Sequence, residues 1–197
     1  MNNLDPQILQ LALQGDDAAF SQLVETYQRP VYNLCYRMLG DGVEAEDAAQ
    51  ETFWRAYQNL RRYDPQRPFI TWLLSIAAHF CIDQQRKRKH PVFPIDEYME
   101  ETAPDPAPSP DRVVSQLDDD QVLHRMIAQL ASQDRAVLIL RYWHEMSEVE
   151  IAHALDMTVS AVKSRLHRAR LLLAKQWETA PTQTSITERK RHESPAF

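Results

Sequence analysis

Apolar residues recur every three or four positions along most of this sequence, the spacing that places them on one face of an α-helix. In the N-terminal part this spacing predicts three helices: one capped by Asp16 or Asp17, one over about residues 43–60, and one that begins near Pro68. Pro30 has no N–H to donate, so a kink is expected within the first helix. No segment alternates with a period of two, and we therefore predict an all-α fold.

The C-terminal part contains the pattern of a helix-turn-helix. Apolar positions predict helices over about residues 122–130 and 137–141. Ser147 and Glu150 have the S-x-x-E spacing of a capping box, which marks the start of a short third helix. After a tight turn, Thr158 is the expected N-cap of a long and strongly basic helix. Two helices joined by a short turn, with the second one basic, are typical of DNA-binding helix-turn-helix units.

An acidic, proline-rich stretch divides the chain. It contains six of the twelve prolines and has little apolar periodicity. We therefore predict two helical domains, at residues 1–90 and 118–177, joined by a linker at residues 91–117. The polar residues 178–197 are expected to form a disordered tail.

The net charge of −6 conceals two basic blocks. Residues 61–90 carry seven basic and two acidic side chains, and residues 159–176 carry five basic and no acidic ones. Residues 91–120, in contrast, carry one basic and nine acidic side chains. The two basic blocks indicate two separate contacts with a polyanion, and the acidic surfaces remain for a different partner.

Several functional classes are disfavoured by what the sequence lacks. Its three glycines cannot form a Gly-rich phosphate loop, and Cys35 and Cys81 form no C-x-x-C pair. Its seven histidines form no metal-binding motif, so we expect no metal, no cofactor and no catalytic residues. A basic targeting segment and an apolar run of about 18 residues are both lacking, so we expect a cytoplasmic protein with no membrane contact of its own.

The long C-terminal helix has an apolar face and a polar face. Val162, Leu166 and Ala169 share the apolar face, so the polar side chains in the N-terminal half of this helix point outward. In a helix-turn-helix, this half of the second helix enters the major groove. A solvated basic face on an ordinary helical hairpin is the alternative. Ser160, Lys163, Ser164 and His167 are expected to face the groove, and Arg165, Arg168 and Arg170 are expected to reach phosphates.

The first domain carries a second basic surface. Cations alternate with an aromatic residue in a proline-bounded loop, and a polar face continues along the following helix, an arrangement that suits unstacked bases of single-stranded DNA. Basic helix ends are common, so this segment taken alone leaves an ordinary solvated surface equally open. The candidates are Arg61, Arg62, Tyr63 and Arg67 in the loop, and Ser75, His79, Asp83, Arg86 and Arg88 on the helix.

A polar stripe lies opposite the alanine-rich face of the second predicted helix. Asp47 is followed at helical spacing by Gln50, Glu51 and Trp54. Such a stripe by itself is most often a solvated surface.

Three segments carry a family resemblance: EAEDAAQETFWRAYQNL, PFITWLLSIAAHFCIDQQRKR and RAVLILRYWHEMSEVEIAHALDMTVSAVKSRLHRAR. In this order they resemble the extracytoplasmic-function (ECF) group of bacterial sigma-70 family factors, over about residues 10–90 and 117–177. The resemblance implies a two-domain initiation factor, with conserved regions 2 and 4, that binds core RNA polymerase and directs it to promoter DNA.

The resemblance also implies a role for each surface. In the family the D-x-x-Q-E stripe, here Asp47, Gln50 and Glu51, binds the clamp helices of the polymerase beta-prime subunit. The loop and third helix of the first domain read and melt the minus-10 element, and the helix-turn-helix reads the minus-35 element. Related factors are commonly held inactive by an anti-sigma factor, which makes such a factor a further expected partner.

Two residues depart from the family pattern. His79 stands where the family often has Asn on the minus-10 face, and Asp156 replaces a frequent turn glycine, which Asp tolerates because it adopts left-handed conformations better than most residues. The main rival interpretation is a stand-alone helix-turn-helix transcriptional regulator. That rival accounts for residues 120–176 but not for the first domain.

Overall fold

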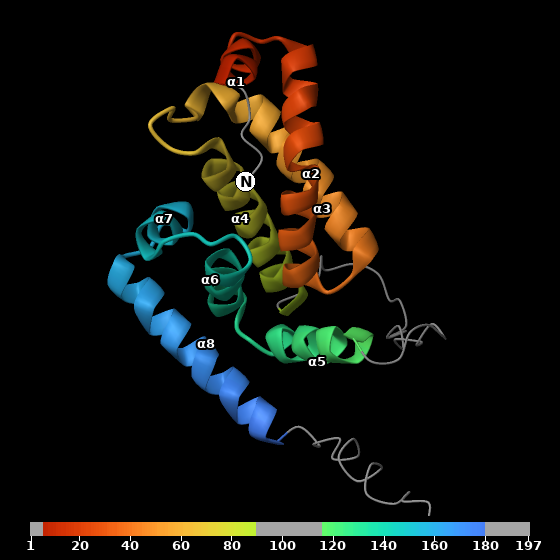
Figure 1. The fold of residues 1–197 in the computed structure, drawn as a ribbon, viewed down its shortest axis with the longest axis vertical. Coiled ribbons are helices and arrows are strands. Elements are labelled where there is room, and N and C mark those ends of the chain that lie inside the picture. The colour runs from red at the N-terminus through yellow and green to blue at the C-terminus, as the bar shows by residue number, and fades with distance from the viewer. Residues whose placement is uncertain (1–5, 90–115, 180–197) are drawn as a thin grey trace, which may run out of the picture.

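The computed structural model describes residues 6–89 and 116–179, and this part of the chain consists of helices joined by short connections (Figure 1). No β-strand occurs in these described residues, and the predicted all-α fold is confirmed for them. The α-helices are α1 (Pro6–Leu13), α2 (Asp17–Leu39), α3 (Gly42–Asn59), α4 (Phe69–Lys89), α5 (Gln116–Ala128), α6 (Ser132–Tyr142), α7 (Glu148–Ala154) and α8 (Val159–Thr179), and the 3-10 turn η1 (Leu60–Arg62) follows α3.

Two predicted segments fall almost entirely outside the described residues. Of the linker predicted at residues 91–117, only the last two residues are described, and they begin α5. Of the tail predicted at residues 178–197, only the first two are described, and they end α8. Both helices therefore extend slightly beyond the domain limits expected from the sequence.

Helices α2, α3 and α4 form a bundle, and α1 packs against α2 (Figure 1). The predicted caps are present: the Asp16 carboxylate accepts a hydrogen bond from the Ala19 amide at 2.9 Å, and Asp16 is the N-cap of α2. Gly40 ends α2 with a φ of 82°, a left-handed conformation that glycine adopts without a Cβ clash. The helix runs on through Pro30 without interruption.

Both cysteines are packing residues. Cys35 of α2 and Cys81 of α4 are free thiols and are fully buried. A hydrogen bond with Cys35, together with burial, raises the pKa of the Cys81 thiol well above its usual range. The thiol is the unreactive form of cysteine, so these residues act as small apolar side chains in the core.

Helices α6, α7 and α8 form the helix-turn-helix unit. The capping box is confirmed, since the Ser147 Oγ accepts the Glu150 amide at 3.2 Å and the Glu150 carboxylate accepts the Ser147 amide at 2.8 Å. Asp156 has the expected left-handed conformation, with a φ of 52°, in the turn between α7 and α8. The Thr158 hydroxyl accepts the Ala161 amide at 3.1 Å, as predicted for the N-cap of α8.

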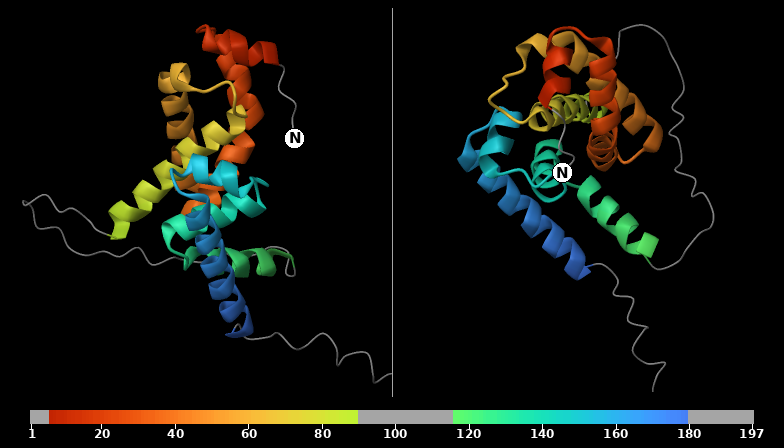
Figure 2. Two further views of the ribbon diagram at one scale, coloured as in Figure 1. Left: turned by 90° about the vertical axis from the view of Figure 1, so that its left-hand side faces the viewer. Right: turned by 45° about the horizontal axis from the view of Figure 1, so that its top comes forward.

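The two helical units pack directly on each other. Helix α6 contacts α2 and α4, α7 contacts α4, and α5 contacts α2, so that α6 and α7 lie between the N-terminal bundle and α8 (Figures 1 and 2). Buried residues of both units belong to one hydrophobic core. The sequence predicted two domains but contained no signal for this contact between them.

Acidification is expected to weaken this packed structure through His144, which follows α6. Burial, and then the positive charge of Arg37, lower the pKa of His144 from 6.5 to about 4. Between these two values the unfolded chain binds a proton that the folded chain does not, so the free energy of unfolding decreases as the pH falls. Chemical unfolding at pH 6.5 and pH 4 should show this slope in the wild type and a smaller one in His144→Gln. The exposed His153→Gln serves as the control, and an unchanged slope in His144→Gln would contradict the assignment.

Candidate nucleic-acid and protein interfaces

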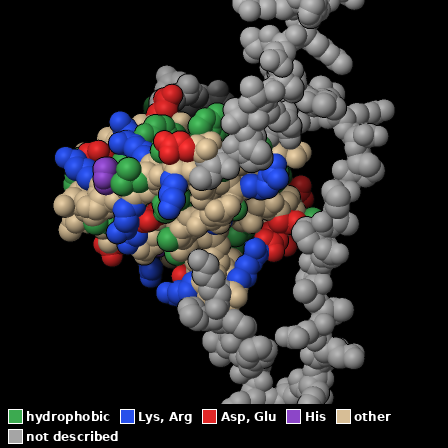
Figure 3. Space-filling model, turned by 90° about the horizontal axis from the view of Figure 1, so that it is seen from below, with side chains coloured by type: hydrophobic (Ala, Val, Ile, Leu, Met, Phe, Trp, Pro, Cys, Tyr) green, Lys and Arg blue, Asp and Glu red, His purple; other side chains and the backbone are tan. Residues whose placement is uncertain are grey.

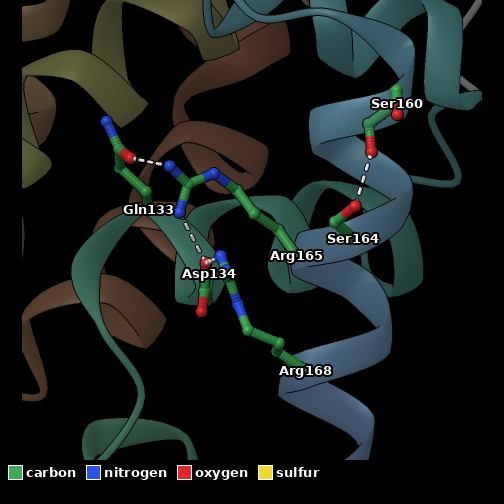
Figure 4. Close-up of polar contacts among 6 residues, drawn as sticks. All are labelled: Gln133, Asp134, Ser160, Ser164, Arg165 and Arg168. Atoms are coloured by element: carbon green, nitrogen blue, oxygen red, sulfur yellow. Dashed lines mark hydrogen bonds and ion pairs between the residues drawn. The ribbon is translucent and has the colours of Figure 1, made fainter.

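The N-terminal half of α8 presents a polar face to solvent. Ser160, Lys163, Ser164 and His167 are all exposed, as expected for side chains that face a groove. The Ser164 hydroxyl donates to the Ser160 carbonyl oxygen at 3.0 Å (Figure 4), and the Lys163 ammonium lies 3.7 Å from the Glu148 carboxylate of α7. Both contacts are at the surface and leave these side chains free to exchange partners.

Arg165 differs from the sequence expectation. Its guanidinium turns toward α6, where it donates to the Asp134 carboxylate at 2.7 Å and to the Gln133 side chain (Figure 4). The Arg165 side chain is 25% exposed and that of Asp134 is 8% exposed, so this ion pair is largely buried. We therefore correct the expectation that Arg165 reaches a phosphate, because here it holds α8 against α6.

Arg168 and Arg170 remain available for phosphate contact. Arg168 shares the Asp134 carboxylate at 3.2 Å, but its side chain is 57% exposed (Figure 4). Arg170 is exposed, and its Nε donates to the Tyr142 hydroxyl at 2.8 Å. Figure 3 views this end of the molecule from below and shows Lys and Arg side chains with exposed apolar ones between them, and α8 contributes Leu171, Leu172 and Trp177 to the exposed apolar residues.

The polar face predicted on α4 is present over three turns. His79 and Arg86 are exposed, whereas Ser75 and Asp83 are partly buried. The His79 Nδ1 lies 2.8 Å from the Ser75 carbonyl oxygen, and Arg86 pairs with Asp83 at 3.1 Å. Both interactions are local to the helix, so the face is presented on a rigid element.

Arg88 lies on another face of α4. Its guanidinium pairs with the Glu44 carboxylate of α3, and both residues line a small hollow with Asp47. Ser75, His79 and Asp83 are each four positions apart and share a face, whereas position 88 is five residues after Asp83 and lies off that face. Arg88 therefore sits beside the α3 stripe with its side chain about half exposed, and its minus-10 contact stays a prediction.

The loop before α4 keeps its cations at the surface but not its aromatic residue. Arg61, Arg62 and Arg67 are exposed, and Arg67 pairs with Asp64 at 3.4 Å. Tyr63 is 7% exposed, and its hydroxyl donates to the Arg67 carbonyl oxygen. The ring packs against Phe69 and Trp72, so Tyr63 cannot offer its face to an unstacked base and the expectation that it does is corrected.

The stripe on α3 is a surface feature. Asp47, Gln50 and Trp54 are exposed and Glu51 is partly buried, with Trp54 57% exposed. Glu51 accepts a hydrogen bond from Arg55 at 2.7 Å. A large apolar side chain held in water beside carboxylates is typical of a surface that binds another protein.

A groove beside this stripe was not predicted from the sequence. It encloses about 890 Å³ between α2 and α3, and Gln50 and Trp54 form part of its wall. Its lining also includes the aromatic residues Phe20, Tyr32, Phe53 and Tyr57, together with polar side chains such as Gln28 and Arg29. Phe53 and Tyr57 of α3 are four positions apart and so share a face, but only the packing of α2 on α3 shows that the aromatic residues of both helices meet at one groove.

Two models of known families match the chain. Sigma-70 region 2 matches residues 23–90, and Sigma-70, region 4 matches residues 120–173. The chain is also 40% identical over 173 residues to the ECF RNA polymerase sigma factor SigW of Bacillus subtilis (strain 168), which covers 83% of this chain and 91% of that protein. The chain belongs to the ECF family of RNA polymerase sigma factors. The resemblance seen in the sequence is thereby confirmed.

Another relative agrees with this assignment, and two solved structures have a similar fold. The sigma factor is 32% identical over 173 residues to the RNA polymerase sigma-H factor of Pseudomonas aeruginosa, covering 84% of this chain and 90% of that protein. Its fold is similar to that of CnrH in complex with the cytosolic domain of CnrY, with a TM-score of 0.66, 24% identity, and coverage of 88% of this chain and 97% of the other. It is also similar to the sigma factor RpoE of Bartonella quintana in complex with the anti-sigma factor NepR, with a TM-score of 0.62, 21% identity, and coverage of 82% and 98%.

The described part of this sigma factor has no feature of a membrane span or of a metal site. None of the helices within residues 6–89 and 116–179 has the length and apolar character needed to cross a membrane. The same residues contain no cluster of His, Cys, Asp or Glu side chains that could hold a metal ion.

Proposed function

We propose that this sigma factor binds core RNA polymerase through α3 and directs it to promoters that contain a minus-10 and a minus-35 element. The observation that carries the proposal is the separation of three exposed surfaces on one chain. The acidic and aromatic stripe lies on α3, and polar or basic faces lie on α4 and α8. A protein partner and two DNA elements account for all three surfaces.

Each surface is assigned to one partner. Asp47, Gln50, Glu51 and Trp54 contact the beta-prime clamp helices of the polymerase. Arg61, Arg62 and Arg67, with Ser75, His79, Asp83 and Arg86, contact the minus-10 element. Ser160, Lys163, Ser164 and His167 read the minus-35 element, and Arg168 and Arg170 contact its phosphates.

The domain assignment follows from these surfaces. Residues 1–90 form the region 2 unit, residues 118–177 form the region 4 unit, and residues 91–117 link them. The protein acts in the cytoplasm, where its partners lie, and leaves catalysis to the polymerase. An anti-sigma factor is a further proposed partner, since the sigma factor RpoE of Bartonella quintana, which has a similar fold, was solved in complex with the anti-sigma factor NepR.

Transcription with purified components tests the proposed function. Core polymerase with this protein is expected to initiate on a subset of a promoter library on which core polymerase alone does not initiate. The selected promoters should share two sequence elements. In a gel shift without polymerase, the protein should bind duplex DNA only weakly.

The stand-alone regulator predicts the opposite pattern. Such a protein would bind duplex DNA tightly by itself and would select a single element. That result, or the absence of any initiation above core polymerase, would overturn the proposed function.

A further inference from the structure

A carboxylate lies beside the exposed polar face of α8. Glu148 is the first residue of α7, and its Oε2 lies 3.7 Å from the Lys163 Nζ of α8. Lys163 is exposed and Glu148 is partly exposed, so this ion pair is open to solvent. Helix α7 packs against α8 next to the N-terminal half of α8 (Figure 1), which is the half assigned to the minus-35 element.

Two other acidic side chains of this unit are engaged elsewhere. Asp134 pairs with arginines of α8 on the side that faces α6. The Glu150 carboxylate accepts hydrogen bonds from the amide and the hydroxyl of Ser147, at 2.8 and 2.7 Å, and so belongs to the cap of α7. Glu148, in contrast, contacts a residue of the exposed face, where residues 159–176 supply five cations and no anion.

The position of Glu148 on α7 places its charge near the DNA backbone. In a helix-turn-helix the second helix enters the major groove, while the first helix crosses the backbone. Here the first helix is α7 and the second is α8. A carboxylate on α7 that reaches the exposed face of α8 therefore lies at the edge of the groove, where it repels phosphates and opposes the sequence-independent part of DNA binding.

The ion pair also limits what Lys163 can contact. An ammonium group has three N–H donors, so contact with Glu148 leaves two of them for DNA. In the major groove these two donors fit the O6 and N7 acceptors of guanine. A phosphate carries no sequence information, and Lys163 could reach one only beside the carboxylate that repels it. Glu148 therefore favours the base contact of Lys163 over a phosphate contact.

We propose that Glu148 is a specificity-determining residue for the minus-35 element, which directs Lys163 to a guanine and weakens binding to DNA that lacks it. This inference rests on the proposed role of α8 in minus-35 recognition. Glu148 acts mainly by lowering the affinity for wrong sequences, since discrimination between two sequences depends on the difference between their affinities.

Binding of the holoenzyme to matched promoters tests this role. The full chain with core polymerase is titrated onto a selected promoter and onto the same promoter with its minus-35 guanines changed to adenine, at a series of salt concentrations. Adenine keeps the N7 acceptor but presents an amino donor in place of O6. The wild type is expected to prefer the guanine promoter.

Glu148→Gln should reduce this preference. Two unit charges about 4 Å apart in water change an equilibrium by about fivefold, so affinity for the adenine promoter should rise by about this factor. The salt slope on that promoter should increase by about 0.9, because Lys163 is then free to take a phosphate. Affinity for the guanine promoter should rise less, since Lys163 loses the partner that directs it to the base.

Matched variants separate this role from a general effect of charge. Glu145→Gln removes the same charge at an exposed position before α7 and should change neither the preference nor the salt slope. Glu148→Asp keeps the charge and should retain most of the preference. In the Lys163→Met background, Glu148→Gln should leave the salt slope unchanged. The pair is exposed, so denaturant unfolding of Glu148→Gln should match that of the wild type.

Three results would overturn the inference. One is an unchanged preference and salt slope in Glu148→Gln, and another is an increase in slope that persists when Lys163 is already replaced. The third is a set of selected promoters whose minus-35 elements lack any guanine. A wild-type holoenzyme with no minus-35 preference at all would overturn the proposed function as well, whereas a wild-type preference that Glu148→Gln leaves intact would overturn only the role of Glu148.

Discussion

Replacing Asp47 and Glu51 by lysine is expected to abolish co-purification of this sigma factor with core RNA polymerase. Both side chains lie on the exposed stripe of α3, beside Trp54. Two lysines reverse the charge of a contact surface, and like charges placed across an interface cost several kcal/mol. The Glu51–Arg55 ion pair lost in the variant is exposed and contributes little to stability. The helical circular dichroism should therefore be unchanged.

A matched variant separates this local effect from the change in net charge. Glu145→Lys combined with Glu178→Lys adds the same charge at exposed positions outside α3. This control should co-purify with polymerase as the wild type does. Unchanged co-purification of the α3 variant would show that polymerase binds elsewhere.

Replacing Arg165 by alanine is expected to destabilise the region 4 unit, whereas replacing Arg168 is not. Both arginines contact Asp134, but Arg165 is 25% exposed and Arg168 is 57% exposed. Breaking a buried ion pair costs about 3–5 kcal/mol, and the lower end applies because Arg168 still contacts the carboxylate. Arg165→Ala should therefore lower the free energy of unfolding by up to about 3 kcal/mol and abolish minus-35 binding. Denaturant unfolding measures the first effect, and holoenzyme binding to promoter DNA measures the second.

The exposed residues of α8 should give two other kinds of result in the same assays. Arg168→Ala and Arg170→Ala should weaken holoenzyme binding to every promoter and lower the salt slope by about 0.9 per lost phosphate contact. Ser164→Ala and His167→Ala should change which minus-35 sequence is preferred, at unchanged stability. Two results would contradict these roles. One is equal stability of Arg165→Ala and Arg168→Ala. The other is that the Ser164 and His167 variants lose affinity equally for every minus-35 sequence.

Local patterns predicted most of the helices because their signals lie within a few residues. The capping box was readable from the side chains of Ser147 and Glu150, three positions apart, and the N-caps Asp16 and Thr158 from residue type just before a helical pattern. Helix α1 was not predicted, since its eight residues give too short a window for helical periodicity. Residues 116–117 and 178–179 extend helices beyond limits drawn from composition.

The site residues were harder to predict because residue type does not fix exposure. Arg165 has the same charge as Arg168 and both contact Asp134, yet the Arg165 side chain is 25% exposed and that of Arg168 is 57% exposed. Tyr63 lies in a run of cations, but it packs with Phe69 and Trp72. The Arg135 guanidinium donates to the Met38 carbonyl oxygen, and these two positions lie far apart in the chain. The periodicity of apolar residues is a local pattern, so it cannot predict such a contact.

Different residues of α8 hold the helix in place and face the DNA groove, so promoter preference can be changed without changing the fold. The arginine that anchors the helix faces α6, while Ser160, Lys163, Ser164 and His167 face solvent. Their contacts with Glu148 and within α8 are at the surface, and substitutions at such exposed positions usually change stability by no more than about 0.5 kcal/mol. A library that varies these four residues on an unchanged scaffold would thus sample new minus-35 specificities, a starting point for insulated gene circuits whose sigma factors ignore one another's promoters.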